Sequence, residues 1–310
     1  MTDALVVASA ARLLLMEMAA GEAVRRLGES GIDCILLKGP AIARWLYEES
    51  EVRPSRDVDL LVRVADVAPA TVALGELGYS CRRVGAAACE LSTVELELLG
   101  TNGVCIDLHH GLLGVPDLSE GGWEVLFGRS VGLGLASGAD VRVLDVPART
   151  MHLALHAAQN GPVDEKAVDD LERGLAKVPF AAWQAAATVA QELDALAAFG
   201  SGLRLCEAGR RVATELDVSP VTNTELVLRS RSAPQGSLFF ERLAEASGGI
   251  RKIKLIGRKL WPTSVCLRAD SVVPLDRPLS LAGARLKRLA SVVRRTPSAL
   301  SAWRSARSPR

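Results

Sequence analysis

The segment that most constrains the fold is ILLKGPAIARWLYEESEVRPSRDVDLLV, which runs from Ile35 to Val62. It holds two apolar, strand-like runs, separated by a helix-like insert and an arginine-containing turn. Pro40 fits the first turn of a helix running to about Glu49, because a residue in that turn needs no N–H group. We therefore expect a strand, a turn, a helix, a second turn and a second strand within one short segment.

The flanking sequence extends this pattern into a small α/β unit. Helical periodicity predicts helices at 4–29 and 65–79. Strands are predicted at 88–99, 103–110 and 141–146, and the GTNG loop between the first two is typical of a hairpin.

After Pro147 the pattern changes to Ala/Leu-rich helical periodicity with almost no strand signal. The predicted fold class is therefore α+β, a small mixed-sheet domain followed by helices. We assign a catalytic domain to 1–147, including the N-terminal helix, an all-α domain to 148–249 and a basic segment to 250–310.

Charge is distributed unevenly along the chain. The net charge is +1, but the segment 250–310 carries fifteen lysines and arginines against two acids, Asp270 and Asp276. This asymmetry indicates an anionic partner, either RNA, including tRNA, or an anionic membrane surface. The alternative is a partly disordered basic tail packed on an acidic body. Aromatic residues make up only 4% of the chain, and no RNA-binding motif with interleaved aromatics is present.

Composition also bears on location. No apolar run reaches the ~18 residues of a membrane span. The N-terminus lacks a basic region and carries Asp3, so it is interpreted as an amphipathic helix and not as a targeting segment. The six cysteines include no CxxC pair, which is typical of a reduced, cytoplasmic protein.

Two carboxylates on one predicted strand suggest a metal site. Asp57 and Asp59 lie two residues apart, so their side chains project to the same side. Like charges this close repel unless a cation lies between them, and Mg²⁺ prefers such oxygen ligands together with substrate phosphates. Asp107, on a later strand, supplies a third acid for phosphoryl or nucleotidyl transfer. The alternative for a DxD pair is a solvated strand edge.

The turn before the first helix suits a phosphate. Gly39 follows a strand and precedes a helix, where backbone N–H groups can approach an anion. Lys38 adds a mobile cation, and Arg53 and Arg56 can add two more. The alternatives are a solvated lysine at a strand end and arginines on a surface loop.

These motifs together resemble a known family. The glycine turn, the DxD strand and the later acid in IDLHHGL are the pattern of the DNA polymerase β-like nucleotidyltransferase superfamily. The KG turn is similar to that of an uncharacterised bacterial nucleotidyltransferase family, itself similar to nucleotidyltransferase toxins with KG in place of GS. LALHAAQNG and the helical segment after it also resemble that family, so the resemblance covers roughly residues 10–215.

The resemblance implies transfer of a nucleoside monophosphate from an NTP, dependent on Mg²⁺ or Mn²⁺, with release of pyrophosphate. Asp57 and Asp59 would bind the metals, and Asp107 would be a further ligand or the base for the acceptor. Lys38 and Gly39 would hold the triphosphate, without the serine contact of a GS turn. The acceptor, a small molecule, a peptide or protein, or tRNA, is left open, as is which NTP is used.

The histidines have two interpretations each. His109 shares the strand face of Asp107 and is expected to contact substrate or metal, or else to be satisfied by backbone at a strand end. His110 stands where the family often has an aromatic residue. His152 and His156 have the i, i+4 spacing of metal ligands, but without a third ligand helix packing is favoured.

A second function class is a non-catalytic NTP- or RNA-binding regulatory protein on a degenerate transferase fold. The intact set of three acids argues against it.

Overall fold

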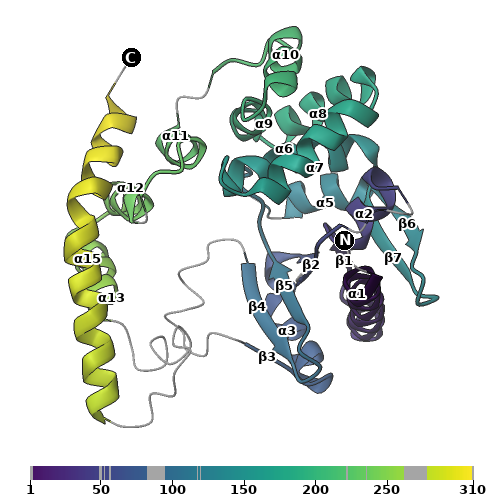
Figure 1. The fold of residues 1–310 in the computed structure, drawn as a ribbon, viewed down its shortest axis with the longest axis horizontal. Coiled ribbons are helices and arrows are strands. Elements are labelled where there is room, and N and C mark those ends of the chain that lie inside the picture. Colours follow the sequence, from purple (N-terminus) through teal and green to yellow (C-terminus); the bar gives the residue numbers. More distant parts are fainter. Residues whose placement is uncertain are drawn as a thin grey trace.

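The computed structural model describes residues 3–48, 51, 53–55, 57–81, 95–116, 118, 120–220, 223–234, 236–261 and 278–308. Within these ranges the chain forms a mixed β-sheet with helices on both faces, followed by a helical C-terminal half (Figure 1). The predicted α+β fold class is confirmed.

The central sheet has five strands in the order β1-β2-β5-β4-β3. They are β1 (Cys34–Leu36), β2 (Asp57–Val62), β3 (Tyr79–Cys81), β4 (Glu95–Gly100) and β5 (Cys105–His109). β2 and β5 are parallel, and every other pairing is antiparallel. The predicted hairpin is confirmed as β4 and β5. Residues 88–94 of the first predicted hairpin strand lie outside the described residues.

One face of the sheet is covered by α1 (Asp3–Glu29) and α3 (Val67–Glu76), which follows the short 3₁₀ turn η1 (Val64–Asp66). The even-numbered residues of β1, β2, β4 and β5 point into this layer, together with Tyr79 and Cys81 of β3, as strand alternation requires. Val58 and Leu60 pack there with Ala20 and Ala23 of α1 and with Leu74 of α3.

A second, two-stranded sheet lies beside β1. It pairs β6 (Ser130–Gly134) with β7 (Asp140–Leu144), and α5 (Glu120–Gly128) precedes it. β7 matches the predicted strand at 141–146, but β6 was not predicted because its sequence SVGLG contains two glycines. Glu17 of α1 holds the hairpin in place, since it accepts from Ala136 N and pairs with Arg44 of α2 (Pro40–Leu46).

The helical half begins with α6 (Val146–Asn160), whose first turn is capped by the Asp145 side chain. The helices that follow are α7 (Glu165–Lys177), α8 (Phe180–Glu192), α9 (Leu196–Leu203), α10 (Glu207–Glu215), α11 (Thr224–Ser230) and α12 (Ser237–Glu245). A single apolar cluster joins Ile35 and Leu61 of the sheet to Met151 and Phe199 of the helices. The predicted boundary near residue 147 thus marks a change of secondary structure within a continuous core.

The basic segment is helical where the structure describes it. α13 (Gly249–Leu260) and α15 (Pro278–Arg307) extend the chain, and α15 packs along α11 and α12 (Figure 1). The Trp303 indole N–H donates to Glu241 of α12 at 2.6 Å. Within the described ranges, no helix combines the length and apolar content needed to cross a membrane.

The contact between α6 and α9 generates a prediction about stability. A Cβ atom at Gly202 would clash with the carbonyl oxygen of Ala154, whereas one at Gly28 of α1 would meet no atom within 4 Å. We expect Gly202→Ala to destabilise the fold by about 1–3 kcal/mol through overpacking. Gly28→Ala is the matched control and should stabilise it by roughly 0.5–1 kcal/mol. Urea denaturation measures both, and equal stabilities would contradict the close approach of these helices.

Candidate active site

Strand pairing brings the three predicted acids together on one sheet face. β2 and β5 are paired so that Asp59 lies opposite Asp107 and Asp57 lies opposite Cys105. Strand alternation places Asp57, Asp59 and Asp107 on the same side, away from the layer of α1 and α3. The three carboxyl groups therefore form one acidic cluster from two parallel strands.

Asp59 is the buried centre of this cluster, with 1% of its surface exposed. Its Oδ1 lies 2.6 Å from Lys38 Nζ and 2.9 Å from His109 Nε2. Burial alone would raise the pKa of Asp59, but the charge of Lys38 and the hydrogen bond from His109 outweigh it and hold that pKa well below its usual range. Asp59 is therefore a carboxylate fixed by two donors.

Lys38 reaches Asp59 because the β1–β2 pairing continues one residue beyond β1, where Leu37 N donates to Asp59 O at 3.0 Å. Burial tends to lower the pKa of Lys38, but attraction by Asp59 gives a net upward shift, so this lysine is charged. Gly39 follows with φ 62° and ψ −120°, a conformation that only glycine adopts readily. The chain thereby turns directly into Pro40 and the seven-residue helix α2.

Asp107 has a different electrostatic environment from Asp59. It is partly buried, and the Cys105 thiol donates to Asp107 Oδ1 at 3.7 Å. Burial, with the negative charges of Asp59 and Asp57, raises the pKa of Asp107 to about 7. Its negative charge is thus poorly compensated, which is the condition that a bound cation relieves.

The donor set fits a divalent cation in its chemistry. Asp57 and Asp107 are partly exposed carboxylates that could hold Mg²⁺ or Mn²⁺, hard cations with a preference for oxygen ligands. Oδ1 of Asp59 is engaged by Lys38 and His109, so Asp59 would use its other oxygen. Among the described residues, no group of three His, Cys, Asp or Glu side chains is arranged to hold a metal ion.

Arg53 lies beside this cluster but does not point a free guanidinium into it. It is 1% exposed and bonds in a bidentate manner to Asp170 of α7, with Nη2 2.5 Å and Nε 2.9 Å from the two carboxylate oxygens. The Tyr47 hydroxyl lies 2.9 Å from an oxygen of Asp170 as well. Arg53 therefore ties the turn before β2 to the helical half. Arg56 lies outside the described residues.

Two further histidines, His152 and His156, lie on α6. His152 and His156 are buried, and burial, with repulsion from Lys38, lowers the pKa of His152 to about 3 and that of His156 well below its usual range. His156 Nε2 lies 2.9 Å from the Asn160 amide. Both imidazoles are neutral, as in the helix-packing interpretation.

Three charged residues near the site were not singled out from the sequence. Glu97 and Glu95 of β4 lie opposite Asp107 and His109, and His109 Nδ1 is 3.6 Å from Glu95 Oε2. The alternation in ELEL could have indicated them. Lys166 of α7 lies within electrostatic range of Asp57 and Asp59, although burial gives its pKa a net downward shift. Only the packing of α7 against α2 and α6 brings Lys166 there.

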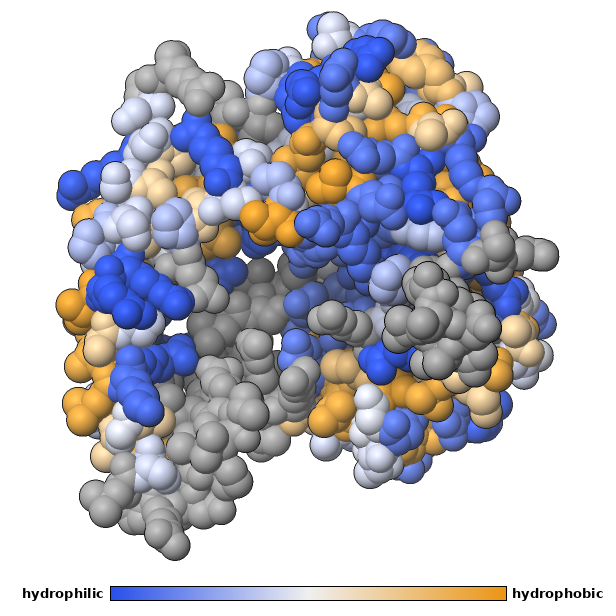
Figure 2. Space-filling model, in the orientation of Figure 1, coloured by the Kyte–Doolittle hydropathy of each residue, from blue (hydrophilic) through white to orange (hydrophobic). Residues whose placement is uncertain are grey.

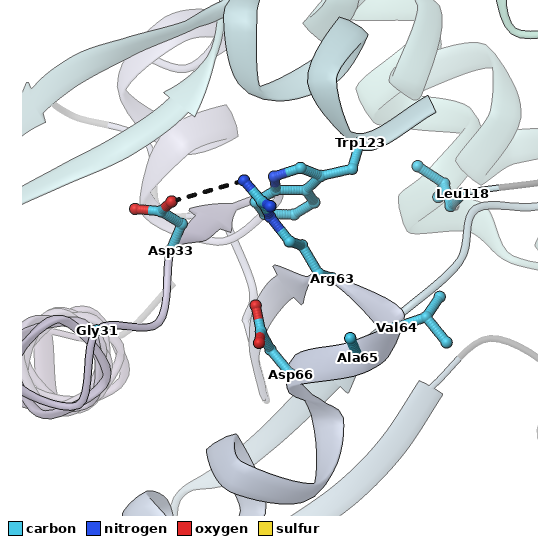
Figure 3. Close-up of a pocket in the computed structure, with 8 residues that line it drawn as sticks. All are labelled: Gly31, Asp33, Arg63, Val64, Ala65, Asp66, Leu118 and Trp123. Carbon is cyan, nitrogen blue, oxygen red and sulfur yellow. Dashed lines mark ion pairs between the residues drawn. The ribbon is translucent and has the colours of Figure 1, made fainter. Parts of the chain in front are cut away.

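A pocket of about 550 Å³ lies past the C-terminal end of β2 (Figure 3). Arg63 projects into it, over the Trp123 ring, and pairs with Asp33 at 4.0 Å and Glu124 at 3.1 Å. None of the predicted site residues lines this pocket. We therefore place the candidate active site at the acidic cluster.

Comparison with known proteins bears on the family. The model of a family described as uncharacterised nucleotidyltransferase matches residues 4–209. No curated protein matches the chain. The solution structure of the antibiotic-resistance factor ANT(2'')-Ia is similar at a TM-score of 0.41 and 13% sequence identity, covering 59% of this chain and 94% of that chain. A similarity of this size carries no argument about the reaction here.

The raised pKa of Asp107 generates a pH prediction. Between the ordinary pKa of an aspartate, near 4, and about 7, the folded protein holds a proton that the unfolded chain has lost. The free energy of unfolding therefore falls as pH rises through this window. We expect Asp107→Asn to remove that loss, so that the variant gains thermal stability over the wild type at pH 8 but not at pH 4.

Thermal unfolding in chelator at both pH values measures the effect. Asp140→Asn, at an exposed position, is the control. A pH-independent difference between Asp107→Asn and wild type would contradict the assigned electrostatics.

The buried pair of Arg53 and Asp170 generates a second prediction. Removing one partner leaves an uncompensated buried charge, so Asp170→Asn should destabilise the fold by about 3–5 kcal/mol. Glu207→Gln removes the exposed partner of Arg211 and should change stability by less than about 1 kcal/mol. Chemical denaturation compares them, and equal small effects would show that Arg53 is not held by Asp170.

Proposed function

This chain belongs to the uncharacterised nucleotidyltransferase family, and from that premise we propose that it transfers a nucleoside monophosphate from an NTP to an acceptor, with release of pyrophosphate. The family match covers more than half of the chain and confirms both the predicted family and the predicted enzyme class. The catalytic residues, the divalent cation and the class of acceptor belong to this proposal.

One observation supports the proposal above the others. Asp59 and Asp107 lie opposite each other on paired strands, Asp57 shares their face, and Lys38 Nζ lies 2.6 Å from Asp59. Fixed carboxylates beside a cation suit phosphate chemistry, in which catalysis is mainly positioning and charge neutralisation. The same face offers acids for Mg²⁺ or Mn²⁺ and a lysine for the triphosphate.

The proposed roles follow from each environment. Asp57 and Asp59 would hold the divalent cation, which neutralises phosphate charge when bound, and Asp107 would be either a further ligand or the base for the acceptor. Lys38 and Gly39 would hold the triphosphate, for which Lys38 must leave its ion pair with Asp59. Arg53 is engaged by Asp170, so its contribution to the nucleotide site would be to position the turn before β2. His109 would orient Asp59 through the hydrogen bond between them.

In the proposed step, an acceptor hydroxyl, amine or phosphate attacks the α-phosphorus. A bond from the acceptor to phosphorus forms, the bond from the α-phosphorus to the β-phosphate oxygen breaks, and pyrophosphate leaves. When the acceptor carries a proton, Asp107 would take it. A pKa of about 7 suits a general base near neutral pH.

The acceptor is left as a class: a small molecule, a peptide or protein, or tRNA. The cations of 250–310 favour an RNA acceptor only through general phosphate attraction. We also propose a cytoplasmic location, in keeping with the six cysteines of the sequence, which include no CxxC pair.

A second candidate function is a non-catalytic NTP- or RNA-binding regulator on the same fold. The observation that favours it is the engagement of Asp59 Oδ1 by Lys38 and His109, which occupies a proposed metal ligand with protein donors. An NTP-binding protein without transfer activity would retain this arrangement throughout its cycle.

Replacement of the acids tests the two candidates. We expect wild-type protein to release pyrophosphate from at least one NTP with Mg²⁺ and a pool of acceptors that includes total tRNA. Asp57→Asn, Asp59→Asn and Asp107→Asn should each lower that rate at least about 100-fold, the scale of lost acid–base or charge stabilisation. Asp66→Asn, which changes an acid just past the end of β2, should retain it.

Binding of NTP–Mg²⁺, measured by calorimetry, separates the outcomes. Tight binding without pyrophosphate release from any NTP favours the regulator. If the wild type and the three variants bind NTP–Mg²⁺ equally poorly, the proposed site is wrong. Labelled α-phosphate appearing in tRNA would identify RNA as the acceptor, and its absence would remove that branch.

A further inference from the structure

Helix α13 has no buried residue, although half of its side chains are apolar. Its sequence is GIRKIKLIGRKL, with five lysines and arginines and no acid. Ile250 is 74% exposed and Ile253 is 70% exposed, and the neighbouring Trp261 is 63% exposed. Isolated exposed apolar residues need no explanation, but a cluster on one cationic helix does.

The exposed apolar residues of α13 share one side. At about 100° per residue, Ile250, Ile253, Ile256 and Leu260 fall within one arc of the helix, and Trp261 continues that arc at the C-terminal end. Basic residues border the arc on both sides, Lys254 on one and Lys252 on the other. We call this arc, made of Ile250, Ile253, Ile256, Leu260 and Trp261, the apolar arc of α13.

The opposite side of α13 faces the protein. Leu255 lies there and is partly buried, and Lys259 Nζ lies 5.4 Å from the Phe239 ring centroid of α12. α13 also contacts α15, and Arg285 lies over the Trp261 ring at 5.0 Å. Attachment through Leu255 and Lys259 leaves Ile250 and Ile253 directed outward, while Trp261, at the end of the arc, lies against Arg285 of α15.

The neighbouring helix has the same character. Leu286 is 66% exposed and Val293 is 63% exposed on α15, seven residues apart and thus on one side of that helix. Figure 2 shows hydrophobic residues beside strongly hydrophilic ones along the left-hand edge of the molecule, where α13 and α15 lie in Figure 1.

We propose that α13 binds the surface of an anionic lipid bilayer, lying in the plane of the interface with its apolar arc among the acyl chains. An amphipathic helix with lysines on the border and isoleucine, leucine and tryptophan on one side has the composition of an interfacial helix. Lysine and arginine side chains are attracted to an anionic leaflet, and tryptophan favours the headgroup level.

Charge distinguishes this partner from the alternatives. A second copy of the chain, seated on the same arc through a two-fold axis, would bring two sets of five cations together without an acid between them. RNA would match the cations but would leave four aliphatic side chains in water, since its affinity comes from phosphate contacts. An anionic bilayer matches the cations and the apolar arc together. This inference does not depend on nucleotidyl transfer.

Vesicle flotation with the full chain tests the proposal. We expect binding to vesicles of phosphatidylcholine with phosphatidylglycerol, and at least tenfold weaker binding to phosphatidylcholine alone. Ile250→Ser/Ile253→Ser keeps every charge but should weaken binding to the anionic vesicles at least tenfold, because the variant loses the apolar surface that the bilayer would bury. Lys252→Gln/Lys254→Gln should weaken it as well. Val72→Ser, at a position 67% exposed on α3, is the matched control and should bind as wild type does.

Three results would overturn the proposal. The first is no binding to anionic vesicles. The second is binding, to vesicles or to RNA, that falls with the lysine pair but not with the isoleucine pair, which would show attraction by charge alone. The third is a dimer in light scattering that Ile250→Ser/Ile253→Ser converts to monomer, which would assign the arc to a second copy. Because the substituted side chains are exposed, circular dichroism is expected to show an unchanged fold in all variants.

Discussion

The parallel pairing of β2 with β5 is the constraint on which the site depends. It sets Asp59 opposite Asp107 and adds Asp57 to the same face, so three carboxylates come together in a partly buried position. Such a cluster is unfavourable by itself, because like charges repel and burial disfavours ionised groups. Apolar packing on the opposite face, where Val58 and Leu60 meet α1 and α3, holds the two strands in register in spite of that repulsion.

The protein compensates the charges of the three carboxylates unevenly. Lys38 and His109 stabilise the charge of Asp59, while Asp107 keeps a pKa of about 7. One acid is therefore fixed and ionised, and another is ready to exchange a proton near neutral pH. The buried pair of Arg53 and Asp170 joins the turn before β2 to α7, so the helical half supports the site without supplying its acids.

Much of this arrangement could be predicted from local pattern. The fold class, the β4–β5 hairpin and the change to helices after Pro147 follow from periodicity and turn chemistry, and the structure bears them out. The family followed from the resemblance of the KG turn, the DxD strand and IDLHHGL, and the family match bears it out. β6 was not predicted because SVGLG contains two glycines, which weaken the strand pattern. The ion pair of Arg53 with Asp170 was not predicted for a different reason. Asp170 is distant in sequence, and no local pattern predicts that pairing.

The sequence by itself determined that Asp57 and Asp59 project to one side, because alternation in a strand is a local property of the backbone. It also determined that the chain turns at Gly39 and that the C-terminal segment is cationic. Only the tertiary structure decided which groups compensate these charges: Lys38 and His109 at Asp59, and Asp170 at Arg53. The physical reason is that strand register and helix packing, which depend on contacts across the whole core, choose the partners of a charge.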